Sequence, residues 1–210
     1  QSFRSGQTRS ATFKQGLLVE ATPLQSTQEP DGTRVVFEPD ASIFKDFQFI
    51  PQFIVEQIWN YVFLNAGLVI AFNGQKYVSK NGLLDLLERK TETETLCYPI
   101  IHVRGEDIEV ALTHNHQYGE EYYSFVNGQF TTQGGTHLAA FKESLIKMVR
   151  DFYKKDFEAS DIRTSIVGAI AIRVQEPIFE SQTKTKLGSQ QIGPSGPTTR
   201  SFVNDFIKKE

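Results

Sequence analysis

The sequence predicts an α+β fold in two unequal parts, and three patterns along the chain lead to this prediction. The first part contains short segments rich in β-branched residues. The second part contains one long segment, residues 136–154, with apolar residues at helical spacing. An apolar run at residues 166–174 follows and has the length of a buried strand. Strand, helix and strand therefore succeed one another in the second part.

The first part begins with strands and continues into a helix. Residues 11–22 and 33–37 are predicted strands, and residues 29–32 form the turn between them. Pro51 stands where a first helical residue is favoured, and residues 65–67, Asn-Ala-Gly, provide a stop. Between them the apolar residues recur at helical spacing: Ile54, Val55, Ile58, Val62 and Phe63.

A tight hairpin and a short helix come next. Residues 68–72 and 75–78 flank Asn73-Gly74, which predicts a two-residue turn because both central positions need a positive φ. Residues 82–89 are predicted to form a short helix, and residues 90–95 form a polar link with no chemistry implied.

The remaining segments are assigned in the same way. Residues 98–103, 107–112 and 121–126 predict an antiparallel meander, with turns at Gly105 and at Asn127-Gly128. Residues 188–197 form a Gly/Pro/Ser-rich loop, and residues 198–209 a final helix. The long helix should bury an apolar stripe, in which Met148 fills the core: Leu138, Phe141, Leu145, Met148, Val149 and Phe152.

Composition bounds the class of protein. A net charge of −3 over 210 residues gives no field of one sign that would grip nucleic acid by bulk electrostatics. The single cysteine, Cys97, excludes an internal disulfide framework and is expected to be a small buried residue. The sequence shows no leader and no apolar run long enough for a bilayer, so we expect a cytoplasmic protein that extends further upstream.

The most informative polar segment is residues 180–187, Glu-Ser-Gln-Thr-Lys-Thr-Lys-Leu, directly after the buried strand. A loop in this place can aim the Lys184 ammonium into a cleft, where its three donors suit the acceptor oxygens of a terminal phosphate. Gln182 points the same way if the loop is extended, and its amide can donate as well. The alternative is a solvated surface lysine, the class to which Lys186 is assigned.

A second segment places Gly134-Gly135 before the long helix. Two glycines allow a sharp turn and expose backbone N–H groups at a positive helix end, which would favour an anion. The alternative for the same residues is a plain strand-to-helix turn with Thr136 near the cap.

Together these segments resemble the B subunits of type IIA DNA topoisomerases, that is, of DNA gyrase and bacterial topoisomerase IV. The resemblance rests on Asn127, on residues 134–137, on Phe141, and on residues 181–187 preceded by Asp161-Ile162-Arg163. Residues 32–37 and 63–67 match the family upstream, so the likeness spans nearly the whole chain. Residues 182–188 look closer to topoisomerase IV. Gln133 departs from the family, in which an acidic residue often precedes the two glycines.

The resemblance implies a fold for each part. Residues 1–80 would be the C-terminal strands and helix of an incomplete ATPase domain of the gyrase, chaperone and histidine-kinase type. Residues 81–210 would be a ribosomal-protein-like transducer domain. Its βαβ unit would have a left-handed crossover, against the right-handed default for such connections.

The resemblance also implies residue roles. The lysine matching Lys184 reaches the γ-phosphate of ATP in the neighbouring domain, with the glutamine matching Gln182 beside it. Thr33 and Val35 match the floor of the adenine pocket, and Arg4 matches an arginine at its rim. The family's catalytic glutamate, magnesium-binding asparagine and glycine-rich lid belong upstream. We therefore expect ATP and Mg²⁺ to bind the full-length subunit, and this chain alone to bind neither and to be inactive.

The implied function is that of the ATPase subunit of an ATP-dependent type II DNA topoisomerase, in which the transducer lysine couples hydrolysis to domain movement and DNA strand passage. The implied partners are DNA, the topoisomerase A subunit and a second B subunit, with no membrane. Two alternatives stay open: a non-enzymatic RNA- or protein-binding module of the same architecture, and a mismatch-repair-type ATPase fragment.

Other polar residues are weaker candidates. His114 and His116 have no third ligand nearby in the sequence for a metal and are assigned to a solvated turn. His102 and His137 are expected to be structural. The acidic residues at positions 106, 107 and 109 alternate beside a turn, which is typical of an exposed strand face. No Walker phosphate loop, catalytic triad or paired-carboxylate site stands out.

Overall fold

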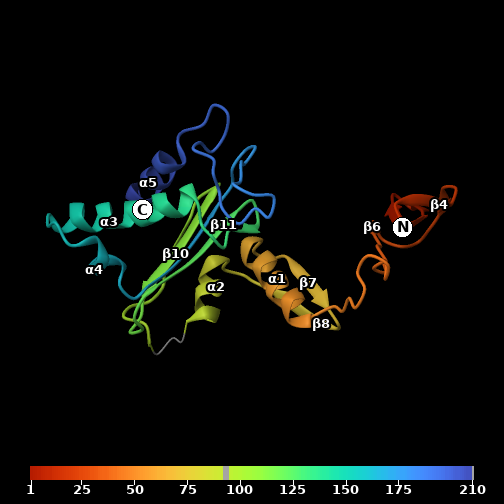
Figure 1. Cartoon of the computed structure of the whole chain (residues 1–210), viewed down its shortest axis with the longest axis horizontal. Coiled ribbons are helices and arrows are strands. Elements are labelled where there is room, and N and C mark those ends of the chain that lie inside the picture. The colour runs from red at the N-terminus through yellow and green to blue at the C-terminus, as the bar shows by residue number, and fades with distance from the viewer. Residues whose placement is uncertain (92–94, 210) are drawn as a thin grey trace. The chain divides into compact units, whose positions relative to one another are not determined.

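The computed structural model describes residues 1–91 and 95–209, which form two compact units, Gln1–Ile50 and Pro51–Glu210 (Figure 1). Part of the predicted polar link, residues 92–94, lies outside the described residues. The family domain boundary expected near residue 80 stays a prediction. Across the described ranges, none of the helices is both long and apolar enough to cross a membrane.

The first unit contains a small sheet and a separate hairpin. The sheet has the strand order β5-β2-β1-β6, and β3 pairs with β4. The bounds are β1 Ser2–Arg4, β2 Gln7–Arg9, β3 Ala11–Lys14, β4 Leu17–Ala21, β5 Gln25–Ser26 and β6 Gly32–Thr33.

Two strand predictions in this unit are wrong in extent. Residues 11–22 form a hairpin because Gln15 and Gly16, with φ of 52° and 80°, turn the chain back on itself. In the segment 33–37 only Thr33 belongs to a strand, where it pairs with Ser2. The N–H of Arg34 still donates to the Gln1 carbonyl, at 2.9 Å. Residues 35–37 pair with no strand among the described residues, because β-branched side chains alone do not make a strand.

The second unit opens with elements that the sequence predicts well. Helix α1 spans Pro51–Leu64, the hairpin comprises β7 Val69–Phe72 and β8 Gln75–Val78, and α2 spans Leu83–Lys90. Asn73 and Gly74 have φ of 48° and 81°, as the tight turn requires. Ile58 and Val62 of α1 pack with Tyr77 of β8, which confirms the predicted apolar face of the helix.

A five-stranded sheet forms the centre of this unit, with the order β12-β11-β13-β10-β9. Its strands are β9 Ile101–Arg104, β10 Ile108–His114, β11 Glu120–Val126, β12 Gln129–Phe130 and β13 Ile166–Ile172. The predicted meander is wrong beyond β9 and β10, because β13 lies between β10 and β11, antiparallel to the first and parallel to the second. A strand that is apolar on both faces is most stable in the middle of a sheet.

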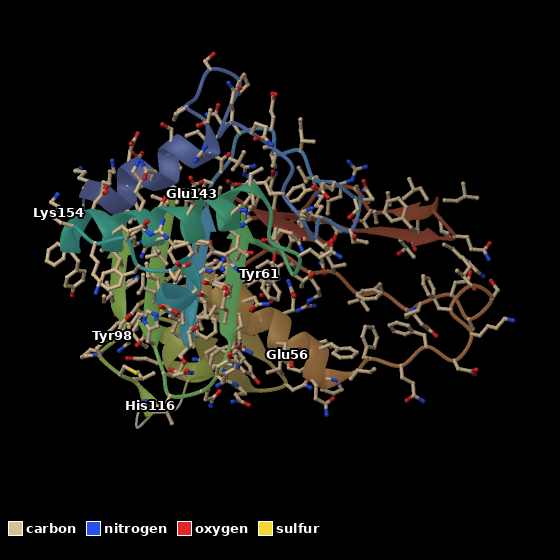
Figure 2. All side chains as sticks on the ribbon, turned by 60° about the vertical axis from the view of Figure 1, so that its left-hand side comes forward. Glu56, Tyr61, Tyr98, His116, Glu143 and Lys154 are labelled. Atoms are coloured by element: carbon tan, nitrogen blue, oxygen red, sulfur yellow. The ribbon has the colours of Figure 1, made fainter. Side chains whose placement is uncertain are left out.

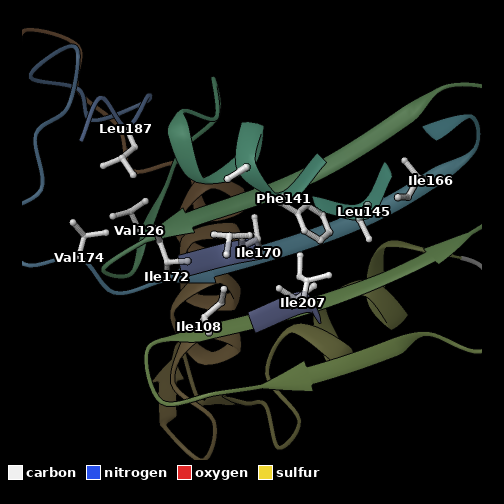
Figure 3. Packing of buried hydrophobic residues seen from close by; sticks show 13 residues of the cluster. Ile108, Val126, Phe141, Leu145, Ile166, Ile170, Ile172, Val174, Leu187 and Ile207 are labelled. Atoms are coloured by element: carbon white, nitrogen blue, oxygen red, sulfur yellow. The ribbon is translucent and has the colours of Figure 1, made fainter. Parts of the chain in front are cut away.

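Alternate residues of the central strands bury opposite faces of the sheet, and Figure 3 shows the cluster on one of these faces. Ile170 faces a cluster that contains Phe141 and Leu145 of α3 and Val203 of α5. Ala169 faces a second cluster, which contains Leu86 and Leu87 of α2. Helices therefore cover both faces, with α3 and α5 on one side and α2 on the other (Figure 1).

The helices of the outer face are α3 Thr136–Tyr153, α4 Ala159–Arg163 and α5 Thr199–Lys209. The buried residues of α3 all lie between positions 137 and 145, so only its first half packs on the core. Met148 and Phe152 are 37% and 77% exposed, and the prediction that they join the core is wrong. The helix ends where Lys154 adopts the left-handed conformation, with φ of 52°.

Candidate functional site

The segment that follows β13 folds into a short hairpin, residues 179–187, which we call the Lys184 loop. Phe179 and Leu187 form an antiparallel bridge, and the Glu180 N–H donates to the Lys186 carbonyl at 3.0 Å. At the tip the Lys184 N–H donates to the Ser181 carbonyl, also at 3.0 Å. The loop is therefore not extended, because backbone hydrogen bonds close it into a turn.

Lys184 stands at the tip of this hairpin with an exposed side chain. Its φ of 56° is left-handed, a conformation that few residues other than glycine adopt. No carboxylate within the described ranges lies close enough to form an ion pair with its ammonium group. Lys186 differs, because its Nζ lies 3.0 Å from Oε1 of Glu180. One lysine of the hairpin is thus held by a partner, and the other is free to meet an external anion.

Gln182 occupies the same turn as Lys184, and its side chain is exposed. Beside it, the hydroxyl groups of Ser181 and Thr183 lie 2.8 Å apart and share a hydrogen bond. The turn brings Gln182 and Lys184 to one tip through its closure, whereas the sequence prediction relied on the alternation of an extended strand.

Backbone hydrogen bonds attach the return leg of the Lys184 loop to the start of α3. The Gln133 N–H donates to the Thr185 carbonyl at 2.9 Å, and the Leu187 N–H donates to the Gly134 carbonyl at 3.0 Å. The Thr136 N–H then donates to the Leu187 carbonyl at 3.1 Å. Gly135 and Leu187 form a parallel bridge. The two segments singled out in the sequence therefore meet.

This attachment favours the plain strand-to-helix turn over an anion site at Gly134-Gly135. The N–H of Gly134 donates to the Thr131 carbonyl at 2.8 Å, and that of Thr136 is used by Leu187. Two of the backbone donors that a bound anion could use at this turn are therefore occupied within the protein.

The side chain of Asn127 holds the segment between β13 and the Lys184 loop, and we call this contact the Asn127 clamp. Nδ2 of Asn127 donates to the Val174 carbonyl, and the Val174 N–H donates to Oδ1 of Asn127, both at 2.8 Å. The amide thus pairs with the backbone just beyond β13 as a neighbouring strand would. The sequence predicts the Asn-Gly turn at Asn127, but it does not reveal this role of the side chain.

Further hydrogen bonds fix the chain just after the loop. Oγ1 of Thr136 donates to the Ser189 carbonyl at 2.7 Å, and the Ile178 N–H donates to Oγ of Ser189 at 2.7 Å. Leu187 is 1% exposed and lies in the same core cluster as Val126 and Val174 (Figure 3). The base of the loop is therefore part of the core, while its tip is exposed.

His137 lies beneath this attachment and is fully buried. Burial lowers the pKa of its imidazole from 6.5 to about 4. Its Nε2 shares a hydrogen bond of 3.2 Å with Oγ1 of Thr131, which also lies 2.8 Å from the Ser124 carbonyl. Nδ1 has no hydrogen-bond partner within the described part of the chain. His137 is a structural residue, as expected.

The first unit contains the other residues expected to meet a nucleotide. Thr33 and Val35 line one hollow of this unit, together with residues of β3. Val35 is 77% exposed, and Arg4 in β1 is exposed but does not line the hollow. The structure thus brings Thr33 and Val35 together and leaves Arg4 apart from them.

Several minor predictions change. Cys97 is exposed rather than buried, and its Sγ lies 3.8 Å from Nδ1 of His116.

His114 is not solvated, since Tyr98 donates to its Nδ1 at 2.5 Å and its Nε2 donates to the Ile162 carbonyl at 2.8 Å. Burial raises the pKa of Tyr98 to about 12. Tyr98 and His116 lie at the same end of the sheet (Figure 2). The described residues include no group of three or more potential metal ligands.

Glu109 corrects the prediction of an exposed acidic face. It is 8% exposed, and its Oε1 lies 2.9 Å from Nε2 of His102. The same oxygen accepts a hydrogen bond from the Leu83 N–H at the start of α2. Glu106 and Asp107 are exposed, as expected.

Comparison with known proteins identifies the family. Residues 76–210 match the family model described as DNA gyrase B. The B subunit of DNA topoisomerase 4 from Borreliella burgdorferi is 40% identical over 100% of this chain and 35% of that protein. The B subunit of DNA gyrase from Thermotoga maritima is 32% identical over 81% of this chain and 31% of that protein. The chain thus spans about a third of the length of these curated relatives.

Solved structures agree with the sequence comparison. The 43K ATPase domain of Thermus thermophilus gyrase B, solved with an aminocoumarin, has a TM-score of 0.74 and 25% identity over 99% of this chain and 61% of that chain. The ATPase region of Saccharomyces cerevisiae topoisomerase II shares the fold, with a TM-score of 0.70 at 18% identity over 98% of this chain and 55% of that chain. The mixed α/β fold resembles that of the gyrase B ATPase domain, and the chain belongs to the DNA gyrase B family.

Proposed function

We propose that this chain is part of the ATPase subunit of an ATP-dependent type II DNA topoisomerase, and that Lys184 senses the γ-phosphate of ATP. In this proposal residues 1–80 are the C-terminal portion of an ATPase domain. Residues 81–210 form a transducer domain with a left-handed crossover between β11 and β13. Membership of the DNA gyrase B family supports the topoisomerase over an RNA- or protein-binding module or a mismatch-repair ATPase.

The observation that carries the proposal is a free ammonium group on a firmly attached hairpin. Lys184 is exposed at the tip and Lys186 is paired with Glu180, so the loop presents one positive charge that no described carboxylate pairs with. Both ends of the loop continue into backbone that is hydrogen-bonded to the core, at Val174 and Leu187. A lysine placed in this way binds a phosphate with little loss of backbone entropy, and a charge-assisted hydrogen bond is stronger than a neutral one.

Four further residues are proposed to contact the nucleotide in the full-length subunit. Gln182 would donate an amide hydrogen bond beside Lys184, Thr33 and Val35 would lie under the adenine, and Arg4 would stand at the rim. The exposure of these side chains fits surfaces that a ligand and upstream residues cover in the full-length subunit. Mg²⁺ would neutralise phosphate charge there, through ligands supplied by the upstream part of the full-length protein.

Binding at Lys184 would convert nucleotide state into domain position. A ligand shifts an equilibrium between two conformations only by its differential affinity for them. A partly desolvated contact between lysine and phosphate is worth about 2 to 3 kcal/mol. That shifts the closed population roughly 30- to 150-fold. Loss of the γ-phosphate after hydrolysis would release the domain. In this way DNA strand passage would be coupled to ATP in an assembly of two B subunits with the A subunit.

Replacement of Lys184 by Ala in the full-length subunit tests the proposal. We expect ATP turnover to fall by about 100-fold or more, as when one preorganised donor to a transition state is removed. The matched control is Lys186→Ala, which removes an equal charge from the same hairpin but breaks only the ion pair with Glu180. Wild-type turnover in Lys184→Ala would end the proposal, and so would an equal loss in both variants.

A further inference from the structure

Gly135 lies where the Lys184 loop crosses the start of α3. A Cβ added to Gly135 would stand 2.4 Å from the carbonyl oxygen of Leu187, 2.5 Å from its nitrogen and 2.8 Å from its Cα. All three are backbone atoms, so no side-chain rotation can relieve the clash. The φ of Gly135 is 134°, a value that residues with a Cβ rarely adopt. Only glycine fits here without displacement of the loop.

Leu187 is packed in the core of the second unit. Leu187 is 1% exposed and packs in the cluster that contains Val126 and Val174. Its N–H and carbonyl groups are both bonded to the segment that surrounds Gly135. A side chain at position 135 would therefore push the return leg of the hairpin away from α3. The displacement would reach the tip, because residues 180 and 186 are hydrogen-bonded to each other.

We infer that Gly135 is a positioning residue for the Lys184 ammonium group, and that its contact with Leu187 sets how far this group reaches toward a bound phosphate. The inference rests on the proposed role of Lys184. Gly135 itself meets no nucleotide and acts through the hairpin. The same contact joins the loop to the first turn of α3, so a force on Lys184 passes directly to an 18-residue helix.

The chain offers a matched control for the backbone strain that any substitution of such a glycine introduces. Gly128 has a positive φ of 80°, but a Cβ added there meets nothing within 4 Å. Gly128→Ala therefore tests strain without a clash. A milder second variant, Thr136→Val, removes the hydroxyl that donates to the Ser189 carbonyl at 2.7 Å and leaves Gly135 intact.

The first measurement is ATP turnover by the full-length subunit. We expect Gly135→Ala to lower kcat by about 100-fold, because displacement of a reacting group by about 1 Å has an effect of this size. Gly128→Ala should stay near the wild-type rate, and Thr136→Val should fall between them. If Gly135→Ala does not fold, the kcat of Thr136→Val relative to the wild type tests the inference in its place. Wild-type turnover in Gly135→Ala, or in Thr136→Val when the first variant is unfolded, overturns the inference.

A double variant separates positioning from general destabilisation. If Gly135 acts through Lys184, the rate of Gly135→Ala with Lys184→Ala equals that of Lys184→Ala alone, since the second change removes what the first misplaces. Independent effects would multiply instead, and a further drop in the double variant contradicts the inference. Single-turnover conditions with excess enzyme keep these low rates measurable.

Limited trypsin cleavage of the 210-residue chain tests the displacement without any nucleotide. We expect faster cleavage after Lys184 in Gly135→Ala than in the wild type and Gly128→Ala. Cleavage after Lys154, at the far end of α3, serves as the reference (Figure 2). Unchanged cleavage after Lys184 overturns the inference. Faster cleavage together with wild-type turnover in Lys184→Ala would instead refute the proposed function while leaving the contact at Gly135 intact.

Discussion

Glu109 of β10 accepts a hydrogen bond of 2.6 Å from the backbone N–H of Leu83, so a strand residue caps the first turn of α2. The glycine before this helix makes the approach possible, because a Cβ on Gly82 would lie only 2.3 Å from Oε1 of Glu109. The contact joins two residues 26 positions apart in the sequence. It holds α2 on the face of the sheet opposite α3 and α5.

Replacement of Glu109 by Ala should lower the free energy of unfolding by about 1 to 3 kcal/mol, because it leaves the buried Leu83 N–H without an acceptor. Urea unfolding followed by Trp59 fluorescence measures this, since the indole, the chain's only one, packs in the α2 cluster. Glu106→Ala, at an exposed position, should change the value by less than about 0.5 kcal/mol. Equal effects of the two substitutions would contradict the capping role.

Asn127 should contribute more to stability than its counterpart in the other Asn-Gly turn. Asn127 and Asn73 have φ of 50° and 48°, so both substitutions to Ala carry the same backbone strain. Only Asn127→Ala also removes the two hydrogen bonds to Val174. We expect it to cost about 1 to 3 kcal/mol more than Asn73→Ala in urea unfolding. Indistinguishable costs would mean that the clamp contributes nothing.

The burial of His137 should make stability depend on pH. Its pKa is about 4 in the folded state, against 6.5 for a free imidazole. As the pH falls through 6.5 the unfolded chain takes up a proton that the folded chain refuses, so stability is complete above 6.5 and is lost toward pH 4. At a pH of about 5 the loss from this group is about 2 kcal/mol.

Urea unfolding of the wild type and of His137→Gln at a pH of about 7.5 and of about 5 measures this loss. The other three histidines are present in both chains, so their contributions cancel in the comparison. The wild type should lose more stability between the two pH values than His137→Gln does. His116→Gln, at an exposed position, should behave like the wild type. An identical pH dependence in His137→Gln and the wild type would refute the buried neutral imidazole.

Local patterns in the sequence predict the elements of this fold better than their arrangement. The two Asn-Gly turns, Pro51 at the start of α1 and the apolar run of β13 depend on residues close together in the chain, and the structure confirms them. The insertion of β13 between β10 and β11 depends on pairing over long separations. One local signal did point to it, because a run that is apolar on both faces favours a central strand.

The candidate site shows the same division. A polar loop directly after a buried strand is enough to single out Lys184 in the sequence. The Gly134-Gly135 pair is visible too, but the local pattern allows either a turn or an anion site. The partner that excludes a Cβ is the Leu187 backbone, far along the chain from Gly135, and no spacing rule reveals it. Glu109 is similar, since alternation beside a turn says nothing of a helix N-terminus that lies against it.

Lys184 itself should carry a stability cost that glycine would relieve. Its φ of 56° is left-handed, where a residue with a Cβ is disfavoured by about 1 to 2 kcal/mol. We therefore expect Lys184→Gly to unfold at higher urea concentration than Lys184→Ala, which keeps the strain and removes the same ammonium group. At Lys186, whose φ is not positive, the order should reverse, because glycine only adds entropy to the unfolded chain. If Ala is the more stable residue at both positions, the turn holds no strain. If glycine is favoured only at position 184, the chain keeps a lysine at a position where the backbone conformation favours glycine. This is expected when the side chain is retained for binding rather than for stability.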